Sequence, residues 1–380
     1  MRLLLTAFKD QNAWEQRKLG EIVEEVKGNS GSINNIPILT ISAANGWMNQ
    51  KDRFSQIIAG NELKKYTLLK KGELSYNHGN SKLAKYGTVF VQDSHDQALV
   101  PRVYHSFKMV AQNNPYFIEY LFASGLPNKE LSKIVTSGAR MDGLLNINKK
   151  EFFSIKLNNP SSEEQSKIAK LFQSLDKTIT LHEEKQRQLE QLKKALLQKM
   201  FADETGYPAL RFKGFTEKWE QSYLKDIASV NSGRDYKHLN KGNIPVYGTG
   251  GYMLSVDKAL SNTKDGIGIG RKGTINNPYI LKAPFWTVDT LFYVIPYNVD
   301  LNFLYGIFQK IDWRKKDEST GVPSLSKENI NKTKFKIPAI SEQKEIGTIF
   351  QNLDTLIALH QHKIDNLKHL KRALLQKMFV

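Results

Sequence analysis

Apolar residues recur at seven-residue spacing in two long stretches of the chain, residues 160–201 and 338–379. Lys, Glu and Gln flank them, and neither stretch contains an internal proline. An apolar seam of this period is typical of a helix that pairs with another helix in a coiled coil. The predicted seam consists of Ile168, Phe172, Leu175, Ile179, His182, Leu189 and Leu196 in the first stretch and Ile346, Phe350, Leu353, Ile357, His360, Ile364, Leu367 and Leu374 in the second.

The two stretches are copies of each other. At a constant offset of 178 residues and without gaps, 22 of 42 positions are identical, which indicates an internal duplication. Each predicted helix is about 60 Å long at about 1.5 Å per residue, too long for one face of an ordinary domain. Two separate amphipathic helices, each lying on its own domain, are the alternative. We favour pairing of the two helices with each other, because both carry the same seam over the same length.

The order of the segments predicts the direction of such a pair. One unit precedes the first helix and a second unit lies between the helices, so the second helix must run back toward the first unit. The pair is therefore predicted to be antiparallel and to hold the two units at opposite ends of a spacer. His182 and His360 occupy the same seam position, where an ordinary seam histidine is the simpler interpretation of each. We predict that this polar pair sets the register and the antiparallel sense of the helices.

Around the helices the chain divides into a first domain at residues 1–159, a helix at 160–203, a second domain at 204–337 with a linker at 202–218, and a C-terminal helix at 338–380. Both domains open on Trp-Glu-Gln and close on a short strand before a proline. Short β-branched and aromatic runs alternate with turn residues, and one apolar helix is expected in each domain, at 114–124 and 299–311. The predicted fold class is α/β (α+β), with two mixed α/β domains in a pseudo-twofold repeat. Their unlike middles suggest one architecture that recognises two different things.

Composition narrows the class of partner. The chain has 380 residues, no cysteine, a formal net charge of +17 and a pI near 9.6. The absence of cysteine excludes disulfides, thiolate metal sites and a cysteine nucleophile. The positive charge favours a polyanionic partner such as nucleic acid, with an unrelated basic protein as the alternative. The apolar run at the N-terminus is too short for a signal peptide or a membrane span, so a cytoplasmic location without membrane contact is expected.

The duplicated helices resemble those of the specificity (S) subunits of type I restriction–modification systems. The similar features are the Glu-Gln-x-x-Ile starts that end at Ile168 and Ile346, the Leu-Asp pairs that follow, and the Leu-Leu-Gln-Lys-Met-Phe endings. The Trp-Glu-Gln segments and the sequence GIGRKGTI around Arg271 are also similar to the target recognition domains of that family. The resemblance covers essentially the whole chain, although the first recognition domain matches only in outline.

The resemblance implies two target recognition domains, each reading one half of an asymmetric bipartite site in double-stranded DNA. It also implies that the paired helices dock two methyltransferase (M) subunits, which allow restriction (R) subunits to join. By the same resemblance the chain is not catalytic by itself. It is expected to hold no cofactor and no metal, with S-adenosylmethionine and ATP in the partner subunits.

The candidate DNA-binding residues are polar or basic side chains in predicted strand-to-turn segments. Arg271 is expected to pair with guanine and Lys272 to contact a phosphate. The segment around Asn77 is interpreted as the equivalent turn of the first domain, with Asn77 pairing with adenine. An ordinary surface turn is the alternative for both segments, and Arg102, Arg140 and Arg234 are more easily interpreted as salt-bridge or phosphate contacts. The full set is Tyr76, Asn77, His78, Lys82, Lys85, Arg102, Arg140, Arg234, Arg271, Lys272 and Thr274.

The enzyme motifs in the chain are weak. The glycines of residues 266–270 resemble a nucleotide or S-adenosylmethionine loop, but a turn and a strand follow instead of a helix. The segments at Asn114 and Asn277 each lack the second proline of the amino-methyltransferase tetrapeptide, and the histidines show no metal-ligand spacing. Two alternative functions stay open: a catalytic DNA methyltransferase or nuclease, and a coiled-coil protein scaffold whose basic charge is incidental.

Overall fold

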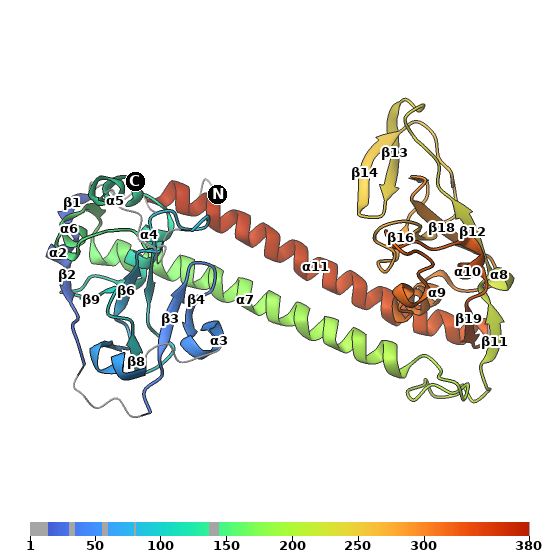
Figure 1. The fold of residues 1–380 in the computed structure, drawn as a ribbon, viewed down its shortest axis with the longest axis horizontal. Helices are drawn as coiled ribbons and strands as arrows, with labels where there is room; N and C mark the ends of the chain where they lie inside the picture. The colour runs from blue at the N-terminus through green and yellow to red at the C-terminus, as the bar shows by residue number, and fades with distance from the viewer. Residues whose placement is uncertain (1–13, 30–34, 55–59, 80, 137–143, 380) are drawn as a thin grey trace. The chain divides into compact units, whose positions relative to one another are not determined.

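The computed structural model describes residues 14–29, 35–54, 60–79, 81–136 and 144–379 (Figure 1). The chain forms two compact units. Unit 1 comprises the residues up to Leu181 and from Lys363 onward, and unit 2 comprises His182–His362. The division falls inside two long helices, α7 (Ser162–Lys199) and α11 (Ile340–Met378). Each unit therefore combines one mixed domain with segments of both helices.

The main sheet of unit 1 is antiparallel and has the strand order β2-β9-β6-β7. Two further antiparallel pairs, β3–β4 and β5–β8, enclose a smaller core. The pair β1–β10 closes the domain. The strands are β1 (Glu15–Lys18), β2 (Val23–Glu25), β3 (Leu39–Ser42), β4 (Gly46–Asn49), β5 (Thr67–Lys70), β6 (Leu74–Asn77), β7 (Thr88–Val91), β8 (Gln97–Val100), β9 (His105–Met109) and β10 (Lys156–Asn159). The helices are α2 (Leu19–Ile22), α3 (Gln50–Phe54), η1 (Gly60–Lys65), α4 (Pro115–Ala123), α5 (Asn128–Ile134) and α6 (Lys149–Ser154).

The main sheet of unit 2 is also antiparallel and has the strand order β12-β18-β15-β16. A second sheet has the order β14-β13-β17, and the pair β11–β19 closes the domain. The strands are β11 (Glu220–Tyr223), β12 (Ala228–Ser232), β13 (Lys241–Gly248), β14 (Gly251–Val256), β15 (Gly266–Gly270), β16 (Tyr279–Leu281), β17 (Trp286–Thr287), β18 (Leu291–Pro296) and β19 (Lys334–Ile337). The helices are α8 (Leu224–Ile227), α9 (Leu301–Lys310), η2 (Trp313–Lys316) and α10 (Lys327–Asn331).

The two domains share one strand order, which confirms a repeated mixed α/β architecture. β2, β9, β6 and β7 correspond in sequence order and pairing to β12, β18, β15 and β16. Both domains also contain a hairpin whose strand region begins Asn-Ile-Pro, at residues 35–37 and 243–245. Each hairpin turns at a glycine with positive φ, Gly46 or Gly251, followed by an aromatic residue and methionine. The duplication therefore extends into the middles of the domains, where the sequence has diverged furthest.

The two apolar helices begin where the sequence predicts, because a polar residue caps each of them. The side chain of Asn114 accepts from two backbone N–H groups at the start of α4, and Asp300 does the same for α9. The segment at Asn114 is therefore a helix start rather than a methyltransferase loop. The glycines of residues 266–270 form the buried strand β15, which pairs on both sides.

In unit 1 the start of α7 packs antiparallel to the end of α11. The rings of Phe172 and Phe379 have centroids 5.8 Å apart, and Lys371 forms an ion pair with Asp176. Larger residue numbers on one helix thus face smaller numbers on the other.

In unit 2 the end of α7 packs antiparallel to the start of α11, through the residues that correspond by the 178-residue offset. Phe350 and Phe201 have ring centroids 5.6 Å apart, and Lys193 forms an ion pair with Asp354. The same seam contacts are therefore made in both units, with the two helices exchanging roles.

Burial of the predicted seam residues follows the heptad pattern. The buried positions are Ile168, Phe172, Ile179, Leu189, Ile346, Phe350, Leu353, Ile364 and Leu374. The half-buried positions are Leu175, His182, Leu196, Ile357, His360 and Leu367.

The opening tryptophan of each domain is part of the core. The ring of Trp14 makes an edge contact with Phe117 at 5.8 Å, and its Nε1 donates to Glu164 on α7 at 3.1 Å. Trp219 contacts Phe303 at 5.6 Å in the same way. The carboxylate that corresponds to Glu164 is Glu342, which in unit 2 forms an ion pair with Arg211 of the linker instead, at 2.8 Å. The linker is thus fastened to the domain that follows it.

Candidate DNA interface

Strand order brings two arginines of unit 2 to the same end of the main sheet. The central strand β18 lies between β12 and β15, and both neighbours are antiparallel to it. The C-terminal ends of β12 and β15 therefore lie together, beside the start of β18. Arg234 follows β12 by two residues, and Arg271 follows β15 directly.

The segment at residues 287–290, which leads into β18, connects both arginine turns. The backbone N–H of Arg234 donates to the carbonyl of Thr287 at 2.9 Å, and that of Arg271 donates to Thr290 at 2.8 Å. A Cβ on Gly233 would lie 1.9 Å from the carbonyl oxygen of Val288, so only glycine permits this approach. The two turns are thus held on one connected piece of backbone.

The side chain of Arg271 lies across the end of the sheet and is exposed. Its guanidinium carbon is 5.8 Å from the centroid of the buried Phe292 ring, and Nη1 donates to the carbonyl of Asp289 at 3.4 Å. A guanidinium has five N–H donors, so most of them stay available for a base edge or a phosphate.

A cavity of about 370 Å³ adjoins this turn. Phe292 lies at its side, and its polar lining consists of Arg271, Lys272, Lys327, Glu318, Ser232, Ser324 and Ser326. The Leu325 backbone N–H donates to the Arg271 carbonyl at 2.9 Å and fixes the wall. Lys272 and Thr274 are exposed. Three cations and three serines face one carboxylate, so the lining keeps an excess of positive charge that suits a phosphate group.

The corresponding turn of unit 1 follows β6. In the paired strands, Tyr76 lies opposite His105, just as Ile269 lies opposite Phe292. His78 therefore occupies the position of Arg271, and its ring stacks on His105 with centroids 5.1 Å apart.

His78 nevertheless does not face outward as Arg271 does, which corrects the prediction that it contacts DNA. It is buried, and its ring nitrogens lie 2.5 Å from the Leu145 carbonyl oxygen and 2.9 Å from that of Val103. These contacts bind the turn to two neighbouring segments. Burial, together with the charge of His78, lowers the pKa of His105 to about 4.

The structure also places Tyr76, another predicted DNA-binding residue, inside the core. Its side chain is 0% exposed, its ring stacks on Phe152 at 4.4 Å, and its hydroxyl donates to the Tyr86 carbonyl at 2.6 Å. Burial raises the pKa of Tyr76 well above its ordinary value. The physical reason is the alternation of side chains along a strand, which sends Tyr76 and His78 into the core.

Asn77 lies on the other side of β6 and is half-buried. Its Nδ2 donates to the Ile41 carbonyl at 3.2 Å, and its Oδ1 accepts from the Gly79 N–H at 3.1 Å. Each end of the amide thus holds one bond, which orients the side chain and leaves one N–H and one oxygen lone pair for a base.

Three further candidates lie on exposed loops of unit 1. Lys82 and Lys85 are exposed in the β6–β7 connection, and Arg102 is exposed in the turn before β9. These two connections meet at the sheet end that corresponds to the arginine end of unit 2, because β6 and β9 are antiparallel neighbours. Arg140 lies outside the described residues.

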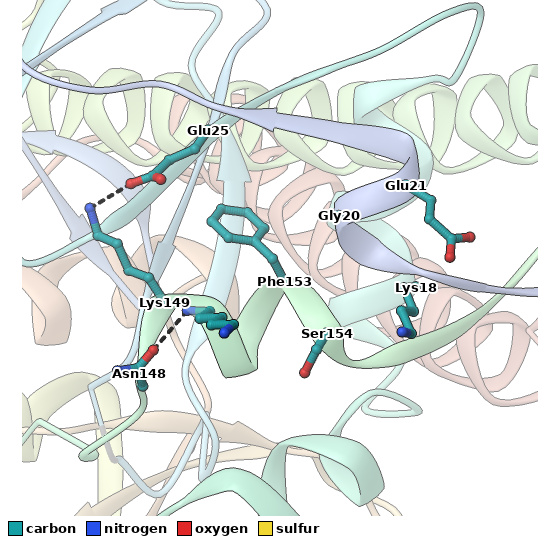
Figure 2. Close-up of a pocket in the computed structure, with 9 residues that line it drawn as sticks. Lys18, Gly20, Glu21, Glu25, Asn148, Lys149, Phe153 and Ser154 are labelled. Carbon is teal, nitrogen blue, oxygen red and sulfur yellow. Dashed lines mark hydrogen bonds and ion pairs between the residues drawn. The ribbon is translucent and has the colours of Figure 1, made fainter.

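Unit 1 also has a groove of about 670 Å³ beside α6 that the sequence did not indicate (Figure 2). Phe153 lines the groove together with the basic side chains of Lys18, Lys149 and Lys150. Glu25 pairs with Lys149 at 2.9 Å. Burial raises the pKa of Glu25, but the bonds to Lys149 and Lys27 outweigh it and lower the pKa overall. Two carboxylates, Glu21 and Glu25, offset most of the charge of these three lysines, so the charge of the groove does not mark it as a phosphate site.

The paired helices of unit 2 expose apolar side chains on their outer faces. Leu192 of α7 is 47% exposed, and Leu356 and Leu359 of α11 are 43% and 46% exposed. Leu356 and Leu359 are three residues apart and so lie on one face of their helix.

Two further properties concern the chemistry of the chain. Within the described residues, no three His, Cys, Asp or Glu side chains gather where they could hold a metal ion. Across the same part of the chain, every helix is too short or too polar to cross a membrane.

The sequence profile of the family described as "Type I restriction modification DNA specificity domain" matches residues 11–191 and 216–369. The chain is 22% identical over 298 residues to the type I restriction enzyme MjaVIII specificity subunit of Methanocaldococcus jannaschii, covering 67% of this chain and 68% of that relative.

Solved structures show the same fold. The crystal structure of the S subunit of a type I restriction–modification system from M. genitalium matches with a TM-score of 0.71 and 16% identity over 98% of both chains. A second structure, from work on complex assembly and conformational transition of the type I R-M system, matches with a TM-score of 0.50 and 13% identity, covering 97% of this chain and 98% of that one.

Proposed function

The chain belongs to the family of type I restriction–modification DNA specificity domains, and from this premise we propose that it is the DNA-recognition subunit of such a complex. Each unit reads one half of an asymmetric bipartite site in double-stranded DNA. The chain provides sequence recognition and leaves the chemistry to other subunits.

The observation that carries this proposal is the equivalence of the two sheet ends. Both units present the same pair of connections around a central strand, after β6 and before β9 in unit 1, and after β15 and before β18 in unit 2. The exposed side chains there differ, since unit 2 presents Arg271 where unit 1 buries His78. Unit 1 exposes Lys82, Lys85 and Arg102 on the same connections instead. One architecture with unlike surface residues is what two unlike half-sites require.

The paired helices act as the spacer that sets the gap between the half-sites, and as the docking surface for two methyltransferase subunits. The exposed leucines of unit 2, Leu192, Leu356 and Leu359, supply apolar surface for such a contact. Restriction subunits join through the assembled complex. S-adenosylmethionine and ATP belong to the partner subunits, and the complex works in the cytoplasm.

The two alternatives have less support. A catalytic methyltransferase would need a cofactor loop, yet residues 266–270 form a buried central strand. A protein scaffold with incidental charge would not need arginines from separate turns at one sheet end, held there by glycines at Gly233 and Gly270.

Binding of the full chain to DNA duplexes tests the proposal. A duplex selected by the chain from a random pool should contain two unlike conserved blocks separated by a gap of fixed length. Its affinity should fall steeply as salt rises, because Lys and Arg displace counterions from phosphates. A selected motif with a single block, or binding without salt dependence, would contradict it. Binding of S-adenosylmethionine by the isolated chain, measured by calorimetry, would support the catalytic alternative.

A further inference from the structure

The hairpin formed by β13 and β14 projects from the body of unit 2 (Figure 1). It carries two large exposed apolar side chains next to each other, Tyr252 at 63% and Met253 at 49% exposure. Residues 243–256 contain no charged side chain, and the turn is rich in glycine. The tip of the hairpin is therefore uncharged and apolar, whereas the turns at Arg234 and Arg271 are basic.

Packing within the domain does not explain these two side chains. The apolar core nearest the hairpin is built around Val246, Val256 and Trp286 and does not include them. Tyr252 makes an edge contact with Tyr247 at 6.4 Å, and its hydroxyl lies 3.2 Å from that of Ser255. In the related hairpin of unit 1, by contrast, the aromatic residue Trp47 packs against the core that contains Tyr104.

Tyr252 and Met253 stand side by side at the tip of the hairpin, where a register shift between Val246 and Tyr247 interrupts the regular alternation of side chains. The tip is thus narrow, uncharged and apolar. Such a tip suits insertion, and a two-stranded ribbon fits a DNA groove. Aromatic side chains stack on bases, and Met is among the residues that wedge between base steps.

The hairpin belongs to the same surface as the two arginines. The Val288 backbone N–H donates to the Tyr247 carbonyl of β13 at 3.0 Å. Val288 lies within the segment at residues 287–290, to which the turns of Arg234 and Arg271 are also bonded. A duplex bound along the arginine end would thus pass close to the hairpin.

Charge around the hairpin favours the same partner. Lys237, Lys241 and Lys258 are exposed at the base of the hairpin, where β13 begins and β14 ends. The neighbouring carboxylate of Asp257 is occupied by Asn240, at 3.0 Å. An uncharged, apolar tip on a base with lysines matches a polyanion whose interior is apolar, as base-paired DNA is.

We propose that the β13–β14 hairpin is a second DNA-binding element of unit 2, in which Tyr252 and Met253 insert into the duplex and partly unstack one base step. This inference rests on the proposed function, since it presumes that unit 2 binds DNA. In this proposal the hairpin deforms the DNA, while Arg234 and Arg271 contact phosphates and base edges.

The test uses the full chain and a duplex selected by the wild-type chain from a random pool. Bound duplexes are probed with permanganate, which oxidises unstacked thymines, and with diethyl pyrocarbonate, which modifies unstacked purines. Wild-type protein should make one step hyperreactive within or beside a single half-site. Tyr252→Ala should remove this reactivity and weaken binding by about tenfold, in the range that loss of one stacked base produces. Met253→Ala should diminish the reactivity.

Tyr297→Ala is the matched control. Tyr297 is 51% exposed and directly follows the other end of β18, away from the arginines. It should bind and distort the duplex as wild type does. Undistorted DNA with wild-type protein, or a Tyr252→Ala variant with wild-type affinity and reactivity, would overturn the hairpin proposal. Failure of the wild-type chain to bind any duplex would instead overturn the proposed function.

Discussion

The Nδ1 atoms of His182 and His360 lie 2.9 Å apart in unit 2. Two ring nitrogens at this distance form a hydrogen bond only when one carries a proton and the other accepts it. The two residues correspond to each other by the 178-residue offset, so at this contact the same position of each repeat copy is paired. A polar pair at the centre of an apolar seam favours one register of the two helices over the alternative registers.

Replacing both histidines with leucine, as His182→Leu together with His360→Leu, should raise stability by about 1 kcal/mol, because an apolar pair replaces a partly buried polar one. The same change should loosen the pairing, so that selected DNA sites tolerate more than one gap length. Calorimetric unfolding and site selection measure the two effects. The single variant His182→Leu serves as the control and should destabilise, since His360 loses this partner. Unchanged stability and an unchanged gap in the double variant would refute the role of the pair.

Arg271→Ala should weaken binding to the selected duplex by about 10- to 100-fold, since a well-placed arginine contributes about 1–3 kcal/mol of base discrimination. Selectivity should relax at one base pair of one half-site and stay intact in the other. Lys272→Ala should weaken binding to all sequences and reduce the salt slope by about one. Fluorescence anisotropy with single-substitution duplexes measures both changes.

Lys225→Ala is the control for these variants, because it removes the same charge from α8, before the start of β12 and so at the opposite end of that strand. A loss of affinity as large in Lys225→Ala as in Arg271→Ala would show that net charge, and not the sheet end, governs binding.

Removing one heptad from each helix, residues 183–189 and 361–367, should shorten the spacer while keeping the seam in phase. Seven residues correspond to about 10 Å of helix. The gap between half-sites should shorten by about three base pairs, at about 3.4 Å each, or binding should be lost. Site selection with the shortened chain measures the gap. Selection of the original gap would contradict the spacer function.

Glu119 gives unit 1 a dependence on pH. Burial raises its pKa to about 7, with an opposing bond from the Val91 N–H at 2.7 Å and further increases from Asp93 and Asp176. The pKa of a glutamate in the unfolded chain is about 4.3. Between this pH and pH 7 the folded state therefore holds a proton that the unfolded state has released. This stability is complete below about pH 4.3 and is lost as pH rises toward 7.

Glu119→Gln should therefore match wild type in acid and exceed it by on the order of 2 kcal/mol at pH 8, because glutamine stays neutral. Urea unfolding at pH 5 and pH 8 measures the difference. Glu151→Gln, at an exposed position of α6, should show no such trend. A stabilisation by Glu119→Gln that is larger in acid than at pH 8 would contradict the assignment.

Much of the architecture could be predicted from local sequence. The seam and the duplication are visible because heptad periodicity and a constant offset are properties of the chain alone. Asn114 and Asp300 mark their helix starts because capping involves only neighbouring residues. The shared Asn-Ile-Pro hairpins were also visible in the sequence, at residues 35–37 and 243–245, and a search for short repeats within the middles would have found them.

The orientation of candidate side chains could not be predicted in the same way. His78 and Arg271 follow corresponding strands, yet one ring is buried between two carbonyl groups and the other side chain is exposed over Phe292. Which outcome occurs depends on segments far away in sequence, such as the one at Leu145. Tyr252 and Trp47 differ for the same reason, since only in unit 1 does a neighbouring core receive the aromatic ring.

By itself, then, the sequence determined that the chain is duplicated, that its two long helices carry one seam, and that two mixed domains accompany them. These are properties of periodicity and of near neighbours. Tertiary structure alone decided that Arg234 and Arg271 meet at one sheet end, because β18 pairs between their strands. It also decided that Tyr76 and His78 belong to the core, because strand pairing determines which face of β6 is covered.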